Sequence, residues 1–248
     1  MKIFLSAIET GNEKSIEKLV KDVKMKYNLM SYYYIRNKKD LAKKIRNNSE
    51  LILIDSGAHS FQFGAKVNFL EYTKQYAEFI KEFDAPNVLG YFEMDIENII
   101  GYEKVLELRK ILEAVSDKII PVWHPERGIK DFEEMCKKYS GKVVAIGGFK
   151  GTDIKDEQFI MFLKVARKYN CKVHCLGMTR KKVLDKVPFD FTDSSSWKQQ
   201  AIRGKIGQRK VSRNFSKTNY NKVIEESYKE AIKMQEHYHH KWQKECKD

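Results

Sequence analysis

Five side chains that can transfer protons or attack carbon stand at or near the ends of predicted strands. Three are aspartates, Asp55, Asp95 and Asp193, and two are histidines, His124 and His174. Asp55 follows four aliphatic residues and opens the sequence Asp-Ser-Gly, and the other four follow or lie within similar apolar runs. Strands that deliver polar side chains to glycine-containing loops are typical of catalytic sites in parallel α/β proteins.

In a parallel α/β fold the carboxyl ends of the strands meet at one face, here called the mouth, so the three carboxylates would lie together there. Like charges raise one another's pKa and are costly to crowd together, so this arrangement indicates a catalytic site. Two acids on opposite faces of a sugar serve as nucleophile and as acid or base at the anomeric carbon. Glycines at this mouth would let a flat ligand hydrogen-bond to the backbone. The side chains and glycines expected to line the mouth beside the five are Ser56, Gly147, Gly148, Gly177 and Met178, with Phe61 or Phe149 against a purine-like ring.

Strand and helix patterns alternate along the whole chain. We expect strands at 2–8, 50–55, 88–94, 118–123, 142–148, 171–177 and 189–193. We expect helices at 12–30, 37–45, 69–83, 97–115, 129–139, 155–169 and 179–186. This order predicts an α/β fold, a (β/α)8 TIM barrel in one domain over 1–248 with its core at 1–197. The eighth strand is not evident, and 206–212 is a candidate. A long C-terminal helix is expected at 219–245.

The net charge of +13 is concentrated in one segment, 194–224, which contains no acidic residue. We interpret this segment as a basic insertion that contacts a phosphate backbone, because its cations alternate with aromatic residues. The expected nucleic-acid contacts are Trp197, Lys198, Arg203, Lys205, Arg209, Lys210 and Arg213. The alternative for Trp197 is packing beneath the segment.

The hydropathy, the N-terminal sequence and the cysteines further limit the class of protein. No apolar run approaches the roughly 20 residues that cross a bilayer, and no signal-peptide pattern precedes the first strand, so we expect no membrane partner and a cytoplasmic location. The four cysteines form no C-x-x-C pair, which favours buried thiols over a zinc site. We therefore expect no cofactor.

Four short motifs resemble the tRNA-guanine transglycosylase family and its branch of phage and bacterial 7-deazaguanine DNA transglycosylases. They are Asp55-Ser-Gly57, Ile146-Gly-Gly148, His174-Cys-Leu-Gly-Met178 and Phe191-Thr-Asp-Ser194, in this order. The resemblance covers about residues 50–197. It implies a (β/α)8 barrel that exchanges guanine in nucleic acid for a 7-deazaguanine through a covalent enzyme–sugar intermediate, as in the pathway of queuosine-like bases.

The resemblance also implies a role for each matching residue. Asp193 would be the nucleophile, with Asp190 as second candidate, and Asp55 the general acid and base. Asp95 would accept hydrogen bonds from the purine's N1 and 2-amino edge. The remaining base contacts would come from Ser56, His124, Gly147, Gly148, His174, Gly177 and Met178.

Departures from the family pattern bear on the substrate. His124 stands where the family commonly has glutamine, which leaves the choice of base open. The cysteine cluster that binds zinc in the tRNA enzymes is missing, as is their Leu-Pro-Thr-Arg run after the nucleophile. This favours DNA over tRNA as acceptor. A homodimer stays open, since members of the family often dimerise, and a phage protein of this kind would act in the host cytoplasm.

Two other functions compete with base exchange. One is a metal-dependent barrel hydrolase with Asp55, His124, His174 and Asp193 as ligands, although no H-x-H or H-x-x-x-H pair supports it. The other is a nucleic-acid-binding partner that keeps the barrel without turnover.

Overall fold

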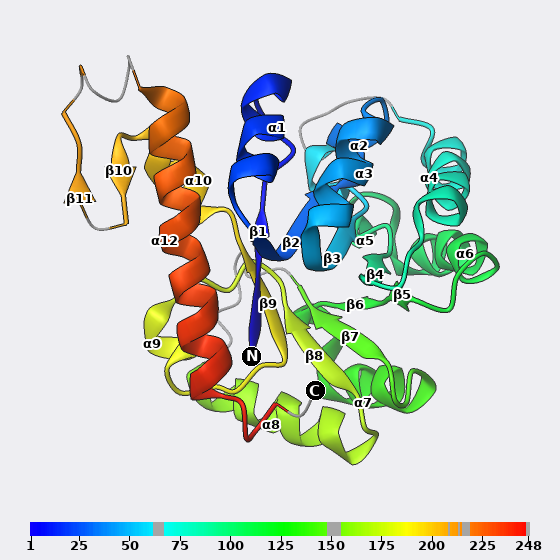
Figure 1. The fold of residues 1–248 in the computed structure, drawn as a ribbon. Helices are drawn as coiled ribbons and strands as arrows, with labels where there is room; N and C mark the ends of the chain where they lie inside the picture. Colours follow the sequence, from blue (N-terminus) through cyan, green and yellow to red (C-terminus); the bar gives the residue numbers. More distant parts are fainter. Residues whose placement is uncertain (62–66, 148–154, 208, 213, 215–218, 247–248) are drawn as a thin grey trace.

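The computed structural model describes residues 1–61, 67–147, 155–207, 209–212, 214 and 219–246. Nine parallel strands form one sheet that curls into a nearly closed barrel, with helices between them (Figure 1). The α/β barrel predicted from the sequence is confirmed. The strands are β1 (Lys2–Ser6), β2 (Met25–Ser31), β3 (Ser49–Asp55), β4 (Val88–Phe92), β5 (Ile119–Ile120), β6 (Val122–Trp123), β7 (Val143–Ile146), β8 (Lys172–Cys175) and β9 (Phe191–Ser194).

The two outermost strands of the sheet are consecutive pieces of one segment. The spatial order runs β5-β4-β3-β2-β1-β9-β8-β7-β6, and only Pro121 separates β5 from β6. Proline has no N–H to donate to a strand ladder, so it interrupts the segment. β5 pairs with β4 and β6 pairs with β7, which brings the two edges of the sheet together and gives eight strand positions around the barrel.

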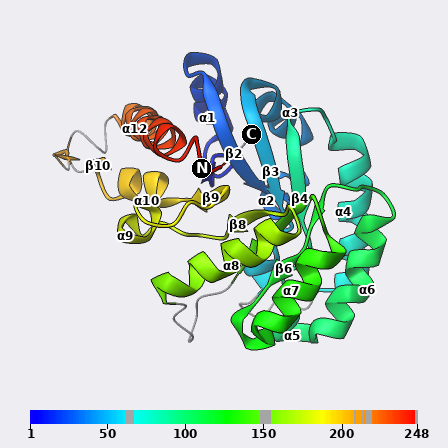
Figure 2. The same ribbon diagram turned by 90° about the horizontal axis from the view of Figure 1, so that it is seen from below.

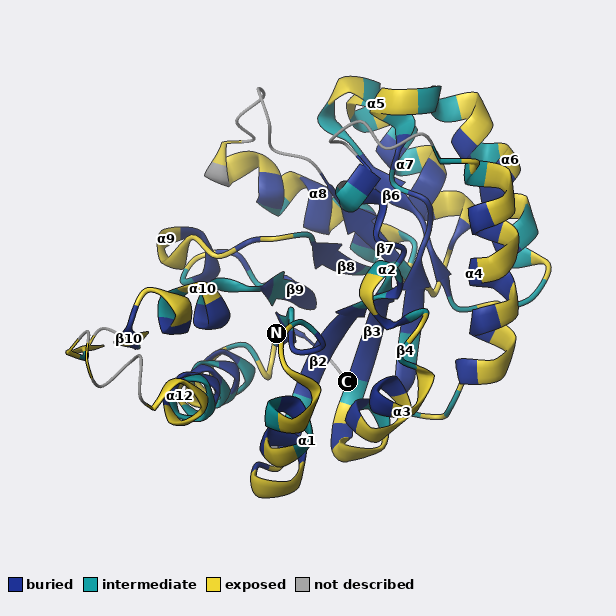
Figure 3. Cartoon of the chain, turned by 90° about the horizontal axis from the view of Figure 1, so that it is seen from above, coloured by how far each residue is buried: buried dark blue, intermediate teal, exposed yellow. Residues whose placement is uncertain are grey.

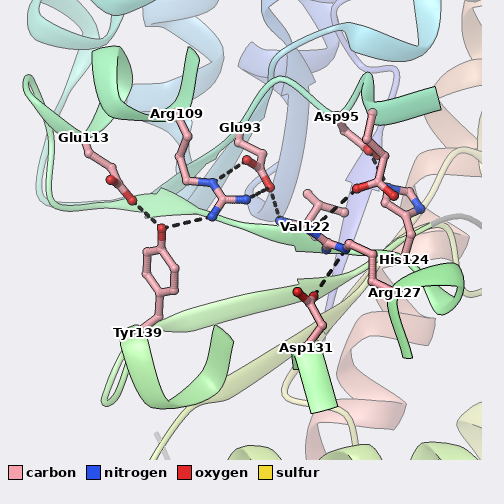
Figure 4. A network of polar contacts seen from close by, with 10 residues as sticks. Glu93, Asp95, Arg109, Glu113, Val122, His124, Arg127, Asp131 and Tyr139 are labelled. Atoms are coloured by element: carbon pink, nitrogen blue, oxygen red, sulfur yellow. Dashed lines mark hydrogen bonds and ion pairs between the residues drawn. The ribbon is translucent and has the colours of Figure 1, made fainter. Parts of the chain in front are cut away.

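A buried ion pair reinforces this seam. The Glu93 carboxylate, just after β4, accepts a hydrogen bond from the backbone N–H of Val122, the residue after the proline. Arg109 holds the same carboxylate with two nitrogens, and the longer contact, from an Nη atom to Oε1, is 2.9 Å (Figure 4). Both side chains are almost fully buried. The pair therefore fixes the end of β4 against the start of β6, and Asp95 and His124 follow these two strands.

The missing strand is β2, not 206–212. The helix expected over 12–30 ends at Asp22, and the chain then extends as β2 between β1 and β3. The apolar pattern did not predict β2, because Asn28 lies in its middle and a polar residue is unusual in a buried strand. Its side chain is fully buried and bonded to Ser49 Oγ at 2.9 Å and to the Tyr228 hydroxyl at 2.6 Å.

Helices cover the outside of the barrel (Figure 2). They are α1 (Glu13–Asp22), α2 (Tyr32–Ile35), α3 (Lys39–Asn48), α4 (Phe69–Phe83), α5 (Glu97–Ile100), α6 (Tyr102–Glu113), α7 (Gly128–Lys138), α8 (Asp156–Lys168), α9 (Lys181–Leu184), α10 (Ser196–Ile202) and α12 (Tyr220–Lys241). Short 3-10 turns span Ala58–Phe61 and Pro125–Arg127. The helix predicted at 97–115 is split by Gly101, whose φ is +83°. Among the described residues, no helix is both long and apolar enough to cross a membrane.

The C-terminal region packs on the barrel through α12. Buried Gln235 donates through Nε2 to the backbone carbonyls of Ile3 and Tyr27, both at 2.7 Å, which ties the helix to β1 and β2. The segment 206–212 contributes no strand to the barrel. Instead β10 (Lys205–Ile206) and β11 (Arg209–Lys210) form a separate antiparallel hairpin.

The strands are the most buried part of the molecule, and the helices expose their outer faces (Figure 3). Inside the barrel a cluster of apolar side chains from most of the strands fills the interior, including Phe4, Leu53, Phe92 and Phe191. Because all nine strands are parallel, their carboxyl ends meet at one mouth above this core.

Candidate active site

Two donors hold one oxygen of Asp193 near the end of β9. Nε2 of His174, on the neighbouring strand β8, lies 3.1 Å from Asp193 Oδ1, and the N–H of Gly177 donates to the same oxygen at 2.8 Å. The His174 ring is fully buried and contacts the Phe92 ring with 5.0 Å between centroids. Within the described residues all hydrogen bonds to this carboxylate go to Oδ1. The other oxygen is therefore the one that would meet an electrophile.

Asp55 occupies a different environment at the end of β3. Its Oδ2 accepts the N–H of Gly57 at 2.8 Å, and Gly57 has a φ of +83°. A Cβ at Gly57 would lie 2.4 Å from Cβ of Tyr33, so this turn requires glycine. Burial, helped by the charges of Asp95 and Asp193, raises the pKa of Asp55 to about 6, although the hydrogen bond from Gly57 acts to lower it. The three predicted acids therefore share one electrostatic site.

Asp95 and His124 form a pair at the same mouth (Figure 4). Nε2 of His124 lies 2.5 Å from Oδ1 of Asp95. Burial acts to lower the pKa of His124, but the hydrogen bond and charge of Asp95 outweigh it, so the pKa lies above its ordinary value. A Cβ at Gly147 would lie 3.0 Å from Cε1 of His124, so the glycine leaves room for this ring.

Buried polar atoms without a partner gather around these groups. Within the part of the chain that the structure describes, no hydrogen bond satisfies Ser56 Oγ, Ser31 Oγ, His174 Nδ1 or Glu9 Oε2. Native proteins leave few buried polar atoms unpaired, and each such atom calls for a ligand, water or functional strain. Four of them beside three carboxylates indicate a site built to receive a polar molecule.

Several predicted residues have other roles in the structure. Asp190 precedes β9, at the opposite end of the strand from the mouth, and binds both terminal nitrogens of Arg167 at 2.7 and 2.9 Å. Its assignment as second candidate nucleophile is therefore wrong. Met178 is buried and packs in the cluster between the strands and α9, and Phe61 packs edge-on against Tyr72. Gly148 and Phe149 lie outside the described residues.

The basic segment is divided between buried and exposed residues. Trp197 is buried and donates through Nε1 to the carbonyl of Ser6 at 2.9 Å, so it packs against the end of β1. Lys198 is also buried, and its amine contacts the carbonyl of Ala7 at 2.9 Å. In this conformation neither side chain is presented for nucleic acid. Of the predicted nucleic-acid contacts, four are exposed: Arg203, Lys205, Arg209 and Lys210. Arg213 lies outside the described residues.

The metal ligands expected for a hydrolase do not come together. In the described parts of the chain, the one trio of side chains close enough to share a metal ion is Glu97, His124 and Glu126. Asp55, His174 and Asp193 are not part of it. Arg127 already lies 3.6 Å from the Glu97 carboxylate and supplies a positive charge there.

Two site residues were missed from the sequence. Glu9 follows β1 much as Asp55 ends β3, so its position after a predicted strand could have identified it as a site residue. Ser31 was hidden because its strand was expected to be a helix. Comparison of the chain with models of known protein families and with curated proteins gave no match. The resemblance to transglycosylases therefore depends on the motifs and their places around the mouth.

Proposed function

We propose that the protein is a base-exchange transglycosylase that replaces guanine in nucleic acid with a 7-deazaguanine. The observation that carries the proposal is the contrast between two aspartates at one mouth. Asp193 is oriented by two donors to a single oxygen, and Asp55 is half-buried with a pKa that desolvation raises. A pair of carboxyl groups in contrasting environments is how enzymes separate a nucleophile from an acid or base.

The reaction would proceed by two displacements. Asp193 attacks C1′ of the nucleotide, and the bond from C1′ to the base breaks with its electron pair going to the base nitrogen. The departing base takes a proton from Asp55. The incoming base then gives a proton to Asp55, and its nitrogen displaces Asp193 from C1′. Asp55 has returned to its acid form and Asp193 to its carboxylate.

Recognition of the base would use the Asp95–His124 pair. Each partner has a polar atom that is not used in their mutual contact: the second oxygen of Asp95 and the Nδ1 atom of His124. A carboxylate oxygen accepts hydrogen bonds, and a protonated imidazole donates them. Together they complement the edge of a guanine-like base, where N–H groups adjoin a carbonyl. Ser56 and the backbone at Gly147 support the same pocket.

The acceptor would be nucleic acid, with DNA favoured over tRNA. The excess positive charge and the exposed cations Arg203, Lys205, Arg209 and Lys210 suit a phosphate backbone. The zinc-binding cysteine cluster of the tRNA enzymes is missing from the sequence. A nucleotide in a duplex would have to leave the base stack before Asp193 could reach its C1′.

Incorporation of labelled guanine tests the proposal. Wild type should incorporate label into DNA, and Asp193→Asn should lose at least a thousandfold of the rate, because no nucleophile remains. The control is Asp40→Asn, an exposed aspartate on α3, which should match wild type. Incorporation into tRNA alone would reverse the choice of acceptor. No incorporation into either, with a folded protein, would contradict the proposal.

A further inference from the structure

Glu9 is a buried carboxyl group at the mouth to which the proposed reaction assigns no role. It lies in a turn directly after β1, where Ala7 has a φ of +69° and Thr10 donates through Oγ1 to the Ala7 carbonyl at 2.9 Å. This turn directs Glu9 inward, and its exposed fraction is 2%. A lone carboxyl group is seldom buried unless it is paired.

The contacts of Glu9 lead to Asp55. Glu9 Oε1 accepts the backbone N–H of Ser31 at 3.0 Å. Ser31 is paired in register with Asp55 across β2 and β3. The Ser31 hydroxyl acts to lower the pKa of Asp55, although no well-aligned hydrogen bond joins the two in the described structure. One serine therefore adjoins both carboxyl groups, and Glu9 Oε2 has no partner among the described residues.

Lys198 stabilises the turn that contains Glu9, but its amine binds backbone and hydroxyl oxygens of the turn and not the Glu9 carboxyl group. Its amine contacts the carbonyls of Ala7 and Thr10 and lies 2.7 Å from Thr10 Oγ1. Burial, helped by the charge of Lys38, lowers the pKa of Lys198 to about 8, although the charge of Glu9 acts to raise it. For Glu9, burial is the largest influence and raises the pKa to about 7. Lys198 acts to lower it and Asp55 to raise it.

The other charged groups around Asp55 act in one direction. Asp95 beyond β4 and Asp193 on β9 both disfavour a second negative charge. Tyr72 and Tyr76 of α4 stay neutral, because burial, with a contribution from Asp55, raises the pKa of each phenol. The mouth therefore holds several acids, and the positive charge of Lys198 acts on Glu9 in the opposite direction to theirs.

We infer that Glu9 and Asp55, on either side of Ser31, form a coupled pair of carboxyl groups, in which a negative charge on Glu9 favours the acid form of Asp55. The inference depends on the proposed base exchange for its purpose. A Glu9 carboxylate disfavours a second negative charge on Asp55, so Asp55 retains the proton that it gives to the departing base. Asp55 takes a proton back from the incoming base, and Glu9 exchanges no proton with either base. Because Glu9 acts through Asp55, it is a positioning residue and touches no substrate.

A carboxyl titration by NMR tests the pair without any substrate. With carbonyl-labelled Glu and Asp, wild type should show one glutamate that titrates near pH 7, well above its ordinary value of 4.5. That signal should vanish in Glu9→Gln and move to lower pH in Asp55→Asn, because coupled groups share their macroscopic pKa values. The inference would be overturned by a Glu9 signal that titrates near pH 4.5, or by one whose titration midpoint is the same in Asp55→Asn as in wild type. Even if a variant fails to fold, a wild-type titration that shows no glutamate near pH 7 would overturn the inference.

The pH dependence of the base-exchange rate tests whether Glu9 affects the reaction through Asp55. Above about pH 7 Glu9 is mostly a carboxylate, and its charge should raise the fraction of Asp55 that stays protonated, which extends the acid-dependent rate to higher pH. Glu9→Gln should match wild type near pH 5.5 and be roughly tenfold slower at pH 8, one pKa unit being worth a factor of ten. Glu9→Asp should recover part of that loss.

Exposed Glu13 supplies the matched control, and Glu13→Gln should leave the profile unchanged. Equal profiles for Glu9→Gln and wild type would refute the coupling between Glu9 and Asp55. If wild type exchanges no base at all, the proposed function fails, and the NMR titration still decides whether the pair exists.

Discussion

At the scale of the residue, the environment of each carboxylate determines its chemistry. The sequence placed Asp55, Asp95 and Asp193 at strand ends, and the structure brings them to one mouth. Their partners were not predictable from residue type. That His174 contacts Asp193 and His124 contacts Asp95 depends on which strands are neighbours in the sheet.

His174→Phe isolates the orientation of the proposed nucleophile. Phenylalanine retains an aromatic ring against Phe92 but removes the nitrogen that contacts Asp193 Oδ1. We expect base exchange to slow by roughly ten- to a hundredfold, since a hydrogen bond to a charged group is worth about 1.5–3 kcal/mol. Single-turnover rates measure this, with a thermal melt to show that the fold survives. An unchanged rate would mean that His174 does not orient Asp193.

At the scale of the element, hydrophobic periodicity predicted seven of the eight strand positions. It failed at β2, where Asn28 occupies a buried site that only tertiary contacts with Ser49 and Tyr228 make tolerable. It also could not show how the barrel closes. That closure depends on Pro121 and on the carboxylate of Glu93 beside it, and neither residue belongs to an apolar pattern.

Arg109→Met tests the seam between β4 and β6. The substitution leaves the Glu93 carboxylate buried without its cation, and breaking such a pair costs about 3–5 kcal/mol. Chemical denaturation should show this loss in the free energy of unfolding. Lys81→Met, which removes the exposed ion pair with Glu78, is the control and should cost less than about 1 kcal/mol. Equal effects of the two variants would show that the Glu93–Arg109 pair does not hold the seam.

At the scale of the whole molecule, the reactive groups and the excess charge lie in different parts of the chain. The acids occupy the barrel mouth, whereas the exposed cations of the basic segment lie just after α10 and on the hairpin β10–β11, which projects beyond α12 (Figure 1). α10 follows β9 directly, so the basic segment begins next to Asp193. In the proposed base exchange, a strand of nucleic acid held by these cations would pass close to the mouth.

The most direct test is to find the covalent intermediate and the atom that carries it. Wild type would be incubated with DNA and, separately, with tRNA in the absence of an incoming base, then denatured and digested for mass spectrometry. We predict a sugar phosphate that has lost its base, attached through C1′ to the peptide that contains Asp193, absent in Asp193→Asn and retained in Asp40→Asn. Such a sugar attached to another residue, or no adduct with either nucleic acid in folded wild type, would contradict the account.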